Sequence, residues 1–202
     1  MTTIRFKIRQ QMRHRRRMLS PTQQKQAAEH LYKVLNTHHL FLRSDRIALY
    51  LPNDGEIDPS LLMQRAWQMN KKIYLPVLHP RKTNHLWFLQ FSQGDKLVNN
   101  KFGIPEPVFH PNKVIRPWLL NLVLFPLVAF DTHGGRLGMG GGFYDRTFAF
   151  SHRNHGSHGP RMIGLAHECQ KTDQHLPLEM WDVKLHAIAS DKHLYWSHKH
   201  GN

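Results

Sequence analysis

The stretch FPLVAFDTHGGRLGMGGGFYDR, residues 125–146, predicts both a strand-to-helix unit and the best candidate site of this 202-residue chain. It places six of the 13 glycines within nine residues, after an apolar run and before a stretch compatible with a helix. Glycine permits positive φ angles and close approach to a ligand, and a loop entering a helix presents free N–H groups. Arg136 adds a forked positive charge. The glycine loop, residues 134–142, therefore predicts an anion site, with a tight strand-to-helix turn as the alternative.

Neither of the two common phosphate-binding motifs is present in this loop. Phe143 stands where a dinucleotide-binding motif needs its third glycine, and the chain contains no Gly-Lys pair for a Walker loop. The residues alone thus indicate an anion site without assigning its type.

Helical and strand-like segments alternate along the chain. Helices are predicted at 4–17, from the N-cap Ser20 through Leu35, after Asp58 and at 144–150, and strands at 46–51, 72–77, 86–91, 122–126, 162–166 and 187–190. This order predicts an α/β fold, a mainly parallel sheet sandwiched between helices, as a single domain over residues 1–202. Ligands of such sheets bind beyond the carboxyl ends of the strands, which selects the 52–58 loop and the glycine loop.

The chain is strongly basic, with a formal charge of +14 and no acidic residue before Glu29. Such a field attracts nucleic acid, nucleotides or polycarboxylates. On the predicted helix 4–17, a basic face lies beside an apolar stripe; the basic face is Arg5, Arg9, Arg13 and Arg16, and the stripe is Ile4, Ile8 and Met12. Basic helices of this kind bind nucleic acid or membranes, or are simply solvated. A nucleic-acid-binding protein is therefore the main alternative to an enzyme, although no basic stripe interleaved with aromatic residues is present.

Several features favour a cytoplasmic protein without a membrane span. The apolar stretch 119–130 is interrupted and too short to cross a bilayer, and the N-terminus lacks an apolar signal core. Cys169 is the single cysteine and is expected to be structural rather than nucleophilic. His152, His155 and His158 recur without a carboxylate or thiol, which favours a solvated loop over a metal site.

Four carboxylates are candidates for specific roles. Glu56 follows Gly55 in the 52–58 loop, where it either accepts hydrogen bonds from a bound ring or remains an exposed carboxylate. Asp58 is expected to cap the next helix. Asp145 and Asp182 are the best candidate Mg²⁺ ligands, with a first-turn helix acid as the alternative for Asp145.

Six segments together resemble one known family over nearly the whole chain. They are PLVAFD (126–131), RLGMGGGFYDR (136–146), LPNDGEID (51–58), YLPV (74–77), GLA (164–166) and LPLEMWD (176–182). The chain is similar to 5-formyltetrahydrofolate cyclo-ligases. The resemblance implies ATP- and Mg²⁺-dependent conversion of 5-formyltetrahydrofolate to 5,10-methenyltetrahydrofolate with release of ADP and phosphate. It also implies small-molecule substrates, and we expect a monomer. A sugar-phosphate or acyl-CoA enzyme on a similar sheet is a further alternative.

The resemblance also implies roles for individual residues. ATP would be bound by Arg5, Arg9, Arg136, Gly138, Met139, Gly140, Gly141, Gly142, Phe143, Tyr144 and Asp145. The folate would be bound by Leu51, Glu56, Met139, Gly140, Gly141, Gly142 and Phe143. Arg136 and Tyr144 would be catalytic, and Asp145 and Asp182 would hold Mg²⁺. The chain departs from the family at Arg5, where lysine is common, and at Met139 and Gly141, which are often basic.

Overall fold

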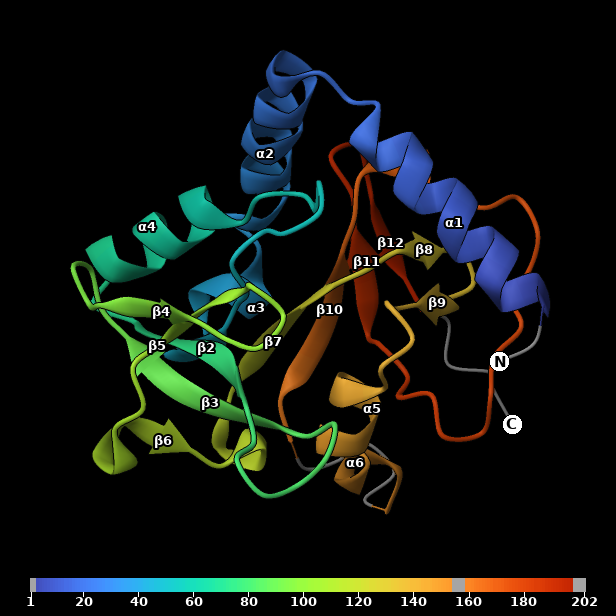
Figure 1. The fold of residues 1–202 in the computed structure, drawn as a ribbon. Helices are drawn as coiled ribbons and strands as arrows, with labels where there is room; N and C mark the ends of the chain where they lie inside the picture. Colours follow the sequence, from blue (N-terminus) through green and yellow to red (C-terminus); the bar gives the residue numbers. More distant parts are fainter. Residues whose placement is uncertain (1–2, 154–158, 198–202) are drawn as a thin grey trace.

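The computed structural model describes residues 3–153 and 159–197. Its main sheet has the spatial order β12 (Leu194–Trp196), β11 (Ala187–Ala189), β10 (Arg161–Leu165), β7 (Leu122–Pro126), β1 (Arg46–Ala48), β2 (Lys72–Leu78), β3 (Leu86–Phe91) and β6 (Val114–Ile115) (Figure 1). The neighbours from β11 through β2 are parallel, whereas β12, β3 and β6 add antiparallel pairs at the two sides. The predicted α/β fold with a mainly parallel sheet is confirmed.

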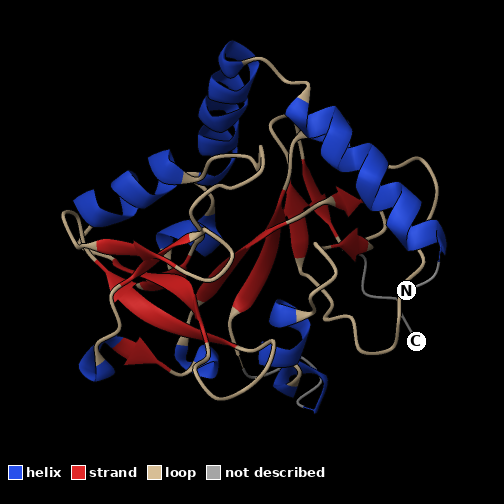
Figure 2. Cartoon of the chain, viewed as in Figure 1, coloured by secondary structure: helices blue, strands red, loops and turns tan. Residues whose placement is uncertain are grey.

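Helices cover both faces of this sheet (Figures 1 and 2). The helices α2 (Pro21–Leu35), α3 (His39–Leu42) and α4 (Ser60–Gln68) share one buried cluster with the sheet, and α5 (Phe143–Thr147) and α6 (Phe150–Arg153) border a second cluster. Alternation along the strands explains the two clusters, because Ile47 and Leu122 belong to the first and the adjacent Ala48 and Val123 to the second. Strands buried on both faces are continuously apolar in sequence.

A third, smaller layer lies beside the main sheet. The helix α1 (Thr3–Arg17) packs over the two-stranded β8 (Ala129–Phe130) and β9 (Arg136–Leu137), with Met12 against Val128 and Leu137. A second two-stranded sheet, formed by β4 (Leu97–Asn99) and β5 (Pro105–Pro107), lies next to β2. The described residues also form the single-turn 3₁₀ helices η1 (Pro111–Lys113), η2 (Pro117–Leu119) and η3 (Glu168–Gln170). The strands β8 and β9 border the glycine loop and hold α1 next to it.

The helix α1 is anchored by its arginines as well as by apolar packing, which corrects the predicted apolar stripe. Ile4 is 64% exposed, whereas Arg9 is 9% and Arg16 is 0% exposed. These two guanidinium groups donate hydrogen bonds to backbone carbonyl oxygens of the protein body. The arginine face therefore points inward.

The predicted ends of other elements also differ, most clearly in three cases. The helix expected at 144–150 is divided into α5 and α6, because the Thr147 hydroxyl bonds back to the Phe143 carbonyl and accepts from the Leu86 amide. The strand expected at 46–51 ends at Ala48. Asp58 accepts from the Ser60 amide at 2.8 Å, one residue before the N-cap Pro59 of α4.

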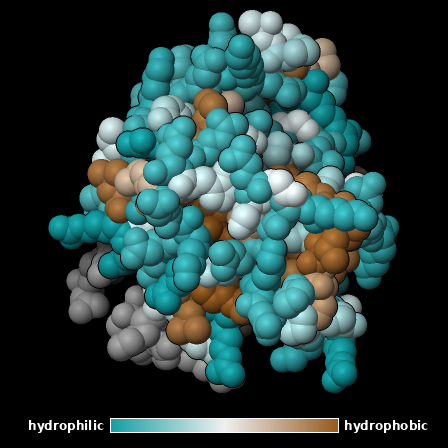
Figure 3. Space-filling model, turned by 90° about the vertical axis from the view of Figure 1, so that its left-hand side faces the viewer, coloured by the Kyte–Doolittle hydropathy of each residue, from teal (hydrophilic) through white to brown (hydrophobic). Residues whose placement is uncertain are grey.

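The histidine-rich segment is covered only in part. His152 is exposed in α6, while His155 and His158 lie outside the described residues. None of the described helices is long and apolar enough to cross a membrane. The face seen in Figure 3 is mostly hydrophilic, with apolar patches between the polar side chains.

Candidate active site

The two loops selected from the sequence follow neighbouring parallel strands. The 52–58 loop follows β1, and the segment leading through the glycine loop follows β7, which pairs with β1. The chain leaves β1 toward β2 on one side and reaches β7 on the other, so the strand order reverses between β1 and β7. Such a reversal opens a crevice at the carboxyl ends of the strands, where ligands of α/β sheets bind.

Arginine side chains of the helix α1 bind the 52–58 loop and hold it in place. Arg16 donates from Nε to the Asp54 carbonyl oxygen at 2.8 Å and from Nη2 to Asp54 Oδ2 at 2.9 Å. Arg13 and Arg17 also pair with the Asp54 carboxylate. Tyr50 closes the loop from inside, because its hydroxyl donates to the Ile57 carbonyl at 2.7 Å. These contacts fix the shape of the loop at the carboxyl end of β1.

Glu56 is the buried acid of this loop. Its side chain is 12% exposed and lies 3.9 Å from Arg16 Nη2, and Oε2 accepts from the Asn53 amide at 3.2 Å. Burial raises the pKa of Glu56 from 4.5 to about 7, although Arg16 and the Asn53 amide oppose the rise. The alternative of an exposed carboxylate is therefore wrong. Leu51 is half-buried against the core beside the same loop.

The glycine loop has an open backbone on the ligand side. Gly140 (φ 97°) and Gly142 (φ 66°) take left-handed conformations that favour glycine. No atom lies within 4 Å of the position that a Cβ of Gly138 would take, and its carbonyl accepts from Arg9 Nε at 2.8 Å. Met139 is half-exposed. The helix that follows, α5, has only five residues, so its dipole adds little and the loop amides and arginines are the main donors.

The two candidate metal ligands lie close together. Asp145 Oδ1 accepts from Arg136 Nη2 at 2.7 Å and from the Val183 amide at 3.1 Å, which places Asp145 beside Asp182. Asp182 Oδ2 accepts from Arg5 Nη2 at 3.0 Å. The second oxygen of each aspartate, Oδ2 of Asp145 and Oδ1 of Asp182, has no hydrogen-bond partner in the described part of the chain. The structure therefore brings together four of the predicted site residues.

Two buried donors in this group lack partners. The Nε atoms of Arg5 and Arg136 have no hydrogen-bond partner among residues 3–153 and 159–197. An unpaired buried N–H is costly, and an anionic ligand would satisfy it. No described group of three or more His, Cys, Asp or Glu side chains forms a metal site by itself. Two carboxylates with phosphate oxygens fit Mg²⁺, which commonly takes few protein ligands.

Aromatic residues lie next to these arginines, with Arg136 Cζ 5.6 Å from the centroid of the Phe125 ring. The Tyr144 ring lies 4.7 Å from that of Phe125, and burial raises the pKa of its hydroxyl well above 10, with a further contribution from Glu56. Tyr144 is therefore a protonated donor at neutral pH. The neighbouring Phe143 ring makes an edge contact with Phe102 from the β4–β5 turn, with centroids 6.2 Å apart.

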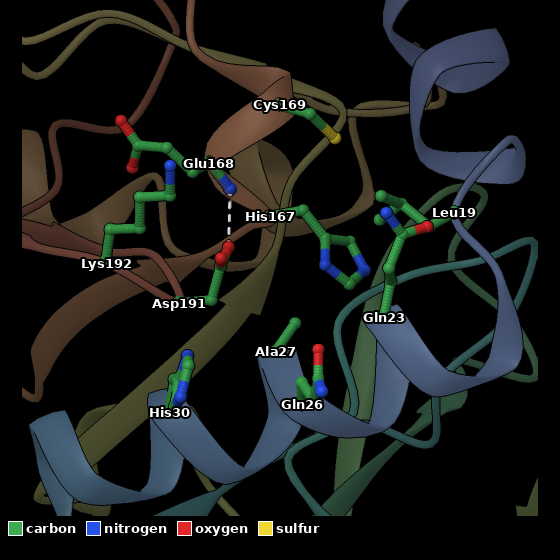
Figure 4. A pocket seen from close by; sticks show the side chains of 10 residues that line it. All are labelled: Leu19, Gln23, Gln26, Ala27, His30, His167, Glu168, Cys169, Asp191 and Lys192. Carbon is green, nitrogen blue, oxygen red and sulfur yellow. Dashed lines mark hydrogen bonds between the residues drawn. The ribbon is translucent and has the colours of Figure 1, made fainter.

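A separate pocket of about 460 Å³ lies at the carboxyl ends of β10 and β11, against α2 (Figure 4). It is lined by none of the predicted site residues. The His167 side chain points into it and is 2% exposed (Figure 4). Cys169 lines the same pocket, and burial raises the pKa of its thiol. A raised thiol pKa disfavours a nucleophile, in line with the expectation for this cysteine.

Sequence reasoning missed three residues that shape the site. Asp54 binds three arginines of α1, and nothing local to the Asn-Asp-Gly turn signals those partners. Asp131 is buried and accepts from the amides of Gly135 and Leu176, which fixes the start of the glycine loop. Its position directly after an apolar run was the available signal. Phe102 comes from a hairpin that was not predicted.

Fold and site define an α/β protein in which a glycine loop and two arginines with unpaired buried Nε atoms lie beyond the parallel strands. The model of the 5-formyltetrahydrofolate cyclo-ligase family matches residues 2–191. Relatives named 5-formyltetrahydrofolate cyclo-ligase include those of Haemophilus influenzae, 41% identical over 191 residues (93% of this chain, 97% of the relative), and Escherichia coli K12, 38% identical over 179 residues (89% and 96%). The solved 5,10-methenyltetrahydrofolate synthetase of Aquifex aeolicus has a TM-score of 0.81 and 26% identity, covering 99% of this chain and 95% of that one. The chain belongs to the 5-formyltetrahydrofolate cyclo-ligase family.

Proposed function

We propose that the chain closes the ring of 5-formyltetrahydrofolate to give 5,10-methenyltetrahydrofolate, using ATP and Mg²⁺ and releasing ADP and phosphate. One observation supports this proposal: the 52–58 loop and the segment leading to the glycine loop follow the parallel neighbours β1 and β7, and the backbone next to Asp182 donates a hydrogen bond to Asp145. The family and the names of the relatives agree with this reaction.

The chemistry needs a better leaving group than a formyl oxygen. Transfer of the ATP γ-phosphoryl group to that oxygen makes a phosphate leaving group. The second folate nitrogen then attacks the formyl carbon and loses its proton to solvent, and the C–O bond breaks to release phosphate. Both steps develop charge on phosphate oxygens, so alignment and neutralising charge are the main demands on the protein.

The arginines meet the demand for charge. Arg136 is 5% exposed and already oriented by Asp145, and its partnerless Nε supports a role as donor to a phosphate oxygen. Arg5 is oriented by Asp182 in the same way. Arg9 holds the Gly138 carbonyl and so orients the loop amides that would receive ATP. Residues 138–145 would thus bind the triphosphate, with Met139 to Phe143 also facing the folate.

Asp145 and Asp182 would hold Mg²⁺ through their free oxygens. When bound, the ion would neutralise phosphate charge. The arginine paired with each carboxylate fixes its direction.

Glu56 and Leu51 would receive the folate ring. A carboxylate accepts hydrogen bonds from amino and ring N–H groups, and Glu56 is buried enough for these bonds to be strong. Tyr144 would donate from its neutral hydroxyl to the reacting end of the folate.

The experiment follows the absorbance of 5,10-methenyltetrahydrofolate after mixing the protein with 5-formyltetrahydrofolate. We expect product only when ATP and Mg²⁺ are both present, with one ADP formed per product. Product without ATP, or ATP binding without any product, would refute the proposed reaction.

The nucleic-acid alternative loses its main support in the structure. Arg5, Arg9, Arg13 and Arg16, its proposed binding face, make hydrogen bonds or ion pairs within the protein. Nucleic-acid binding by this face would have to break those contacts. Its test is salt dependence, since six to ten phosphate contacts weaken affinity by about a thousandfold or more between low and moderate salt.

A further inference from the structure

The joint between β7 and β8 leads the chain from the main sheet toward the glycine loop. Leu127 and Val128 form this joint, and both are buried. Directly after it, β8 pairs with β9, which carries Arg136. Buried carbonyl oxygens need donors. The donors that meet the carbonyls of Leu127 and Val128 therefore decide where β8 and β9 lie relative to the main sheet.

Gln170, the last residue of η3, supplies such donors from a fully buried side chain. Its Nε2 donates to the Leu127 carbonyl and to the Val128 carbonyl, each at 2.8 Å. Its Oε1 accepts from the His167 amide at 2.9 Å. Because the side-chain amide is bound through its nitrogen and its oxygen, it cannot turn without losing a buried hydrogen bond.

The Leu127 carbonyl also accepts a hydrogen bond from the 52–58 loop's main anchor, Arg16. Arg16 Nη1 donates to it at 3.1 Å, while Nε and Nη2 of the same guanidinium bind the carbonyl and the carboxylate of Asp54. One carbonyl oxygen thus receives both Gln170 and Arg16. A continuous chain of hydrogen bonds runs from η3 through the β7–β8 joint to the 52–58 loop. Figure 1 shows α1, which carries Arg16, beside β8 and β9.

We propose that Gln170 is a positioning residue that couples the two substrate loops, so that ATP at the glycine loop and the folate at the 52–58 loop strengthen each other's binding. This inference rests on the proposed function and deepens it. Phosphoryl transfer needs the γ-phosphate and the formyl oxygen in reacting contact, which tolerates little error in the relative position of the loops. Gln170 is fully buried and acts through Leu127 and Arg16.

Loss of Gln170 should weaken this coupling more than it weakens either loop alone. The Leu127 carbonyl would keep Arg16 as a donor, and Arg16 would keep Asp54, so the 52–58 loop retains its anchor. The Val128 carbonyl would lose the Gln170 donor, and β8 would no longer be fixed from the side of η3. Coupling between sites depends on packed and hydrogen-bonded elements that connect them, and this connection would be loosened.

The test measures the dissociation constant of 5-formyltetrahydrofolate with and without Mg²⁺ and a non-hydrolysable ATP analogue. In the wild type we expect the analogue to tighten folate binding about fivefold or more, and the folate to tighten analogue binding by the same factor. In Q170M, which keeps the length of the side chain without its polar atoms, the factor should fall below about twofold. R16K breaks the chain at its other end and should lower the factor too, because an ammonium cannot replace the guanidinium fork.

The matched control is L62A. Leu62 is buried in α4, away from the joint, so this variant loses stability through a cavity and should keep the wild-type coupling factor. Equal coupling factors in the wild type and Q170M, or no coupling in the wild type, would overturn the proposal.

A second arm follows amide hydrogen exchange in the ligand-free protein. In Q170M, exchange should rise in residues 53–57 and in residues 127–137 together, beyond any general rise seen in L62A. A rise confined to η3 would overturn the role of Gln170. If the wild type converts no folate, the proposed function fails, and the exchange arm still decides whether Gln170 joins the two loops.

Discussion

Replacing Glu56 by Gln should stabilise the protein at alkaline pH while weakening folate binding. The carboxylate is almost fully enclosed, and its pKa in the folded protein is about 7 against 4.5 for the free side chain. Gln has the same shape and keeps an acceptor for the Asn53 amide. Arg16 retains Asp54 as a partner, so removal of the Glu56 charge leaves no unpaired cation.

The sign and size of this change in stability follow from proton linkage. Because the pKa is higher in the folded state, the folded protein holds a proton between pH 4.5 and about 7 that the unfolded chain releases. The contribution of Glu56 to stability is therefore greatest below pH 4.5, falls as pH rises, and levels off above pH 7. At about 1.4 kcal/mol for each pH unit between the two pKa values, the full loss of folding stability is about 3 kcal/mol. About 2.5 kcal/mol of this loss develops between pH 5 and pH 8.5.

Urea unfolding of the wild type and E56Q at pH 5 and pH 8.5 measures this difference. We expect the stability of E56Q relative to wild type to increase by about 2.5 kcal/mol across that interval. In the ring-closing assay, E56Q should raise KM for the folate more than for ATP. A stability difference that does not change with pH would refute the reasoning, as would an effect confined to ATP.

Three other substitutions test the site and its support. R136A should lower kcat by about 10²–10³-fold with the fold intact, since one donor to developing phosphate charge is lost; near-wild-type turnover at saturating ATP would contradict this role. R16A should destabilise the protein by about 3 kcal/mol in urea unfolding, because it removes a fully buried charge and its hydrogen bonds to backbone carbonyls. The control is R15A at an exposed position, which should change stability by less than about 0.5 kcal/mol. Equal effects of the two substitutions would refute the anchoring role of Arg16. G135A should destabilise by about 1–3 kcal/mol, because its Cβ would stand 2.3 Å from Asp131 Oδ2; unchanged stability would show that the turn adapts freely.

The parts of the fold that were predictable depend on local patterns. Apolar runs in the sequence predicted β2, β3 and β7. The Ser20–Gln23 capping box is also present as expected: the Gln23 backbone N–H donates to Ser20 Oγ, and the Ser20 backbone N–H donates to Gln23 Oε1. The glycine loop and the 52–58 loop could be selected because parallel strands present their carboxyl ends at one edge.

The rest depends on partners far apart in sequence. Arg16 is buried because Asp54, 38 residues away, supplies a carboxylate and a carbonyl, and no pattern within α1 specifies that partner. The pairing of Asp145 with the backbone next to Asp182 likewise spans 38 residues. The split between α5 and α6 results from a hydrogen bond between Leu86 and Thr147. Such contacts form only once the sheet is assembled.

The glycine loop is proposed to hold the phosphates of ATP next to Asp145 and Asp182. A crystal structure with Mg²⁺ and a non-hydrolysable ATP analogue would test this placement. We expect the triphosphate against residues 138–143 and Arg136, with the metal ion in contact with both aspartates directly or through water. A nucleotide seated instead in the pocket lined by His167 would contradict it.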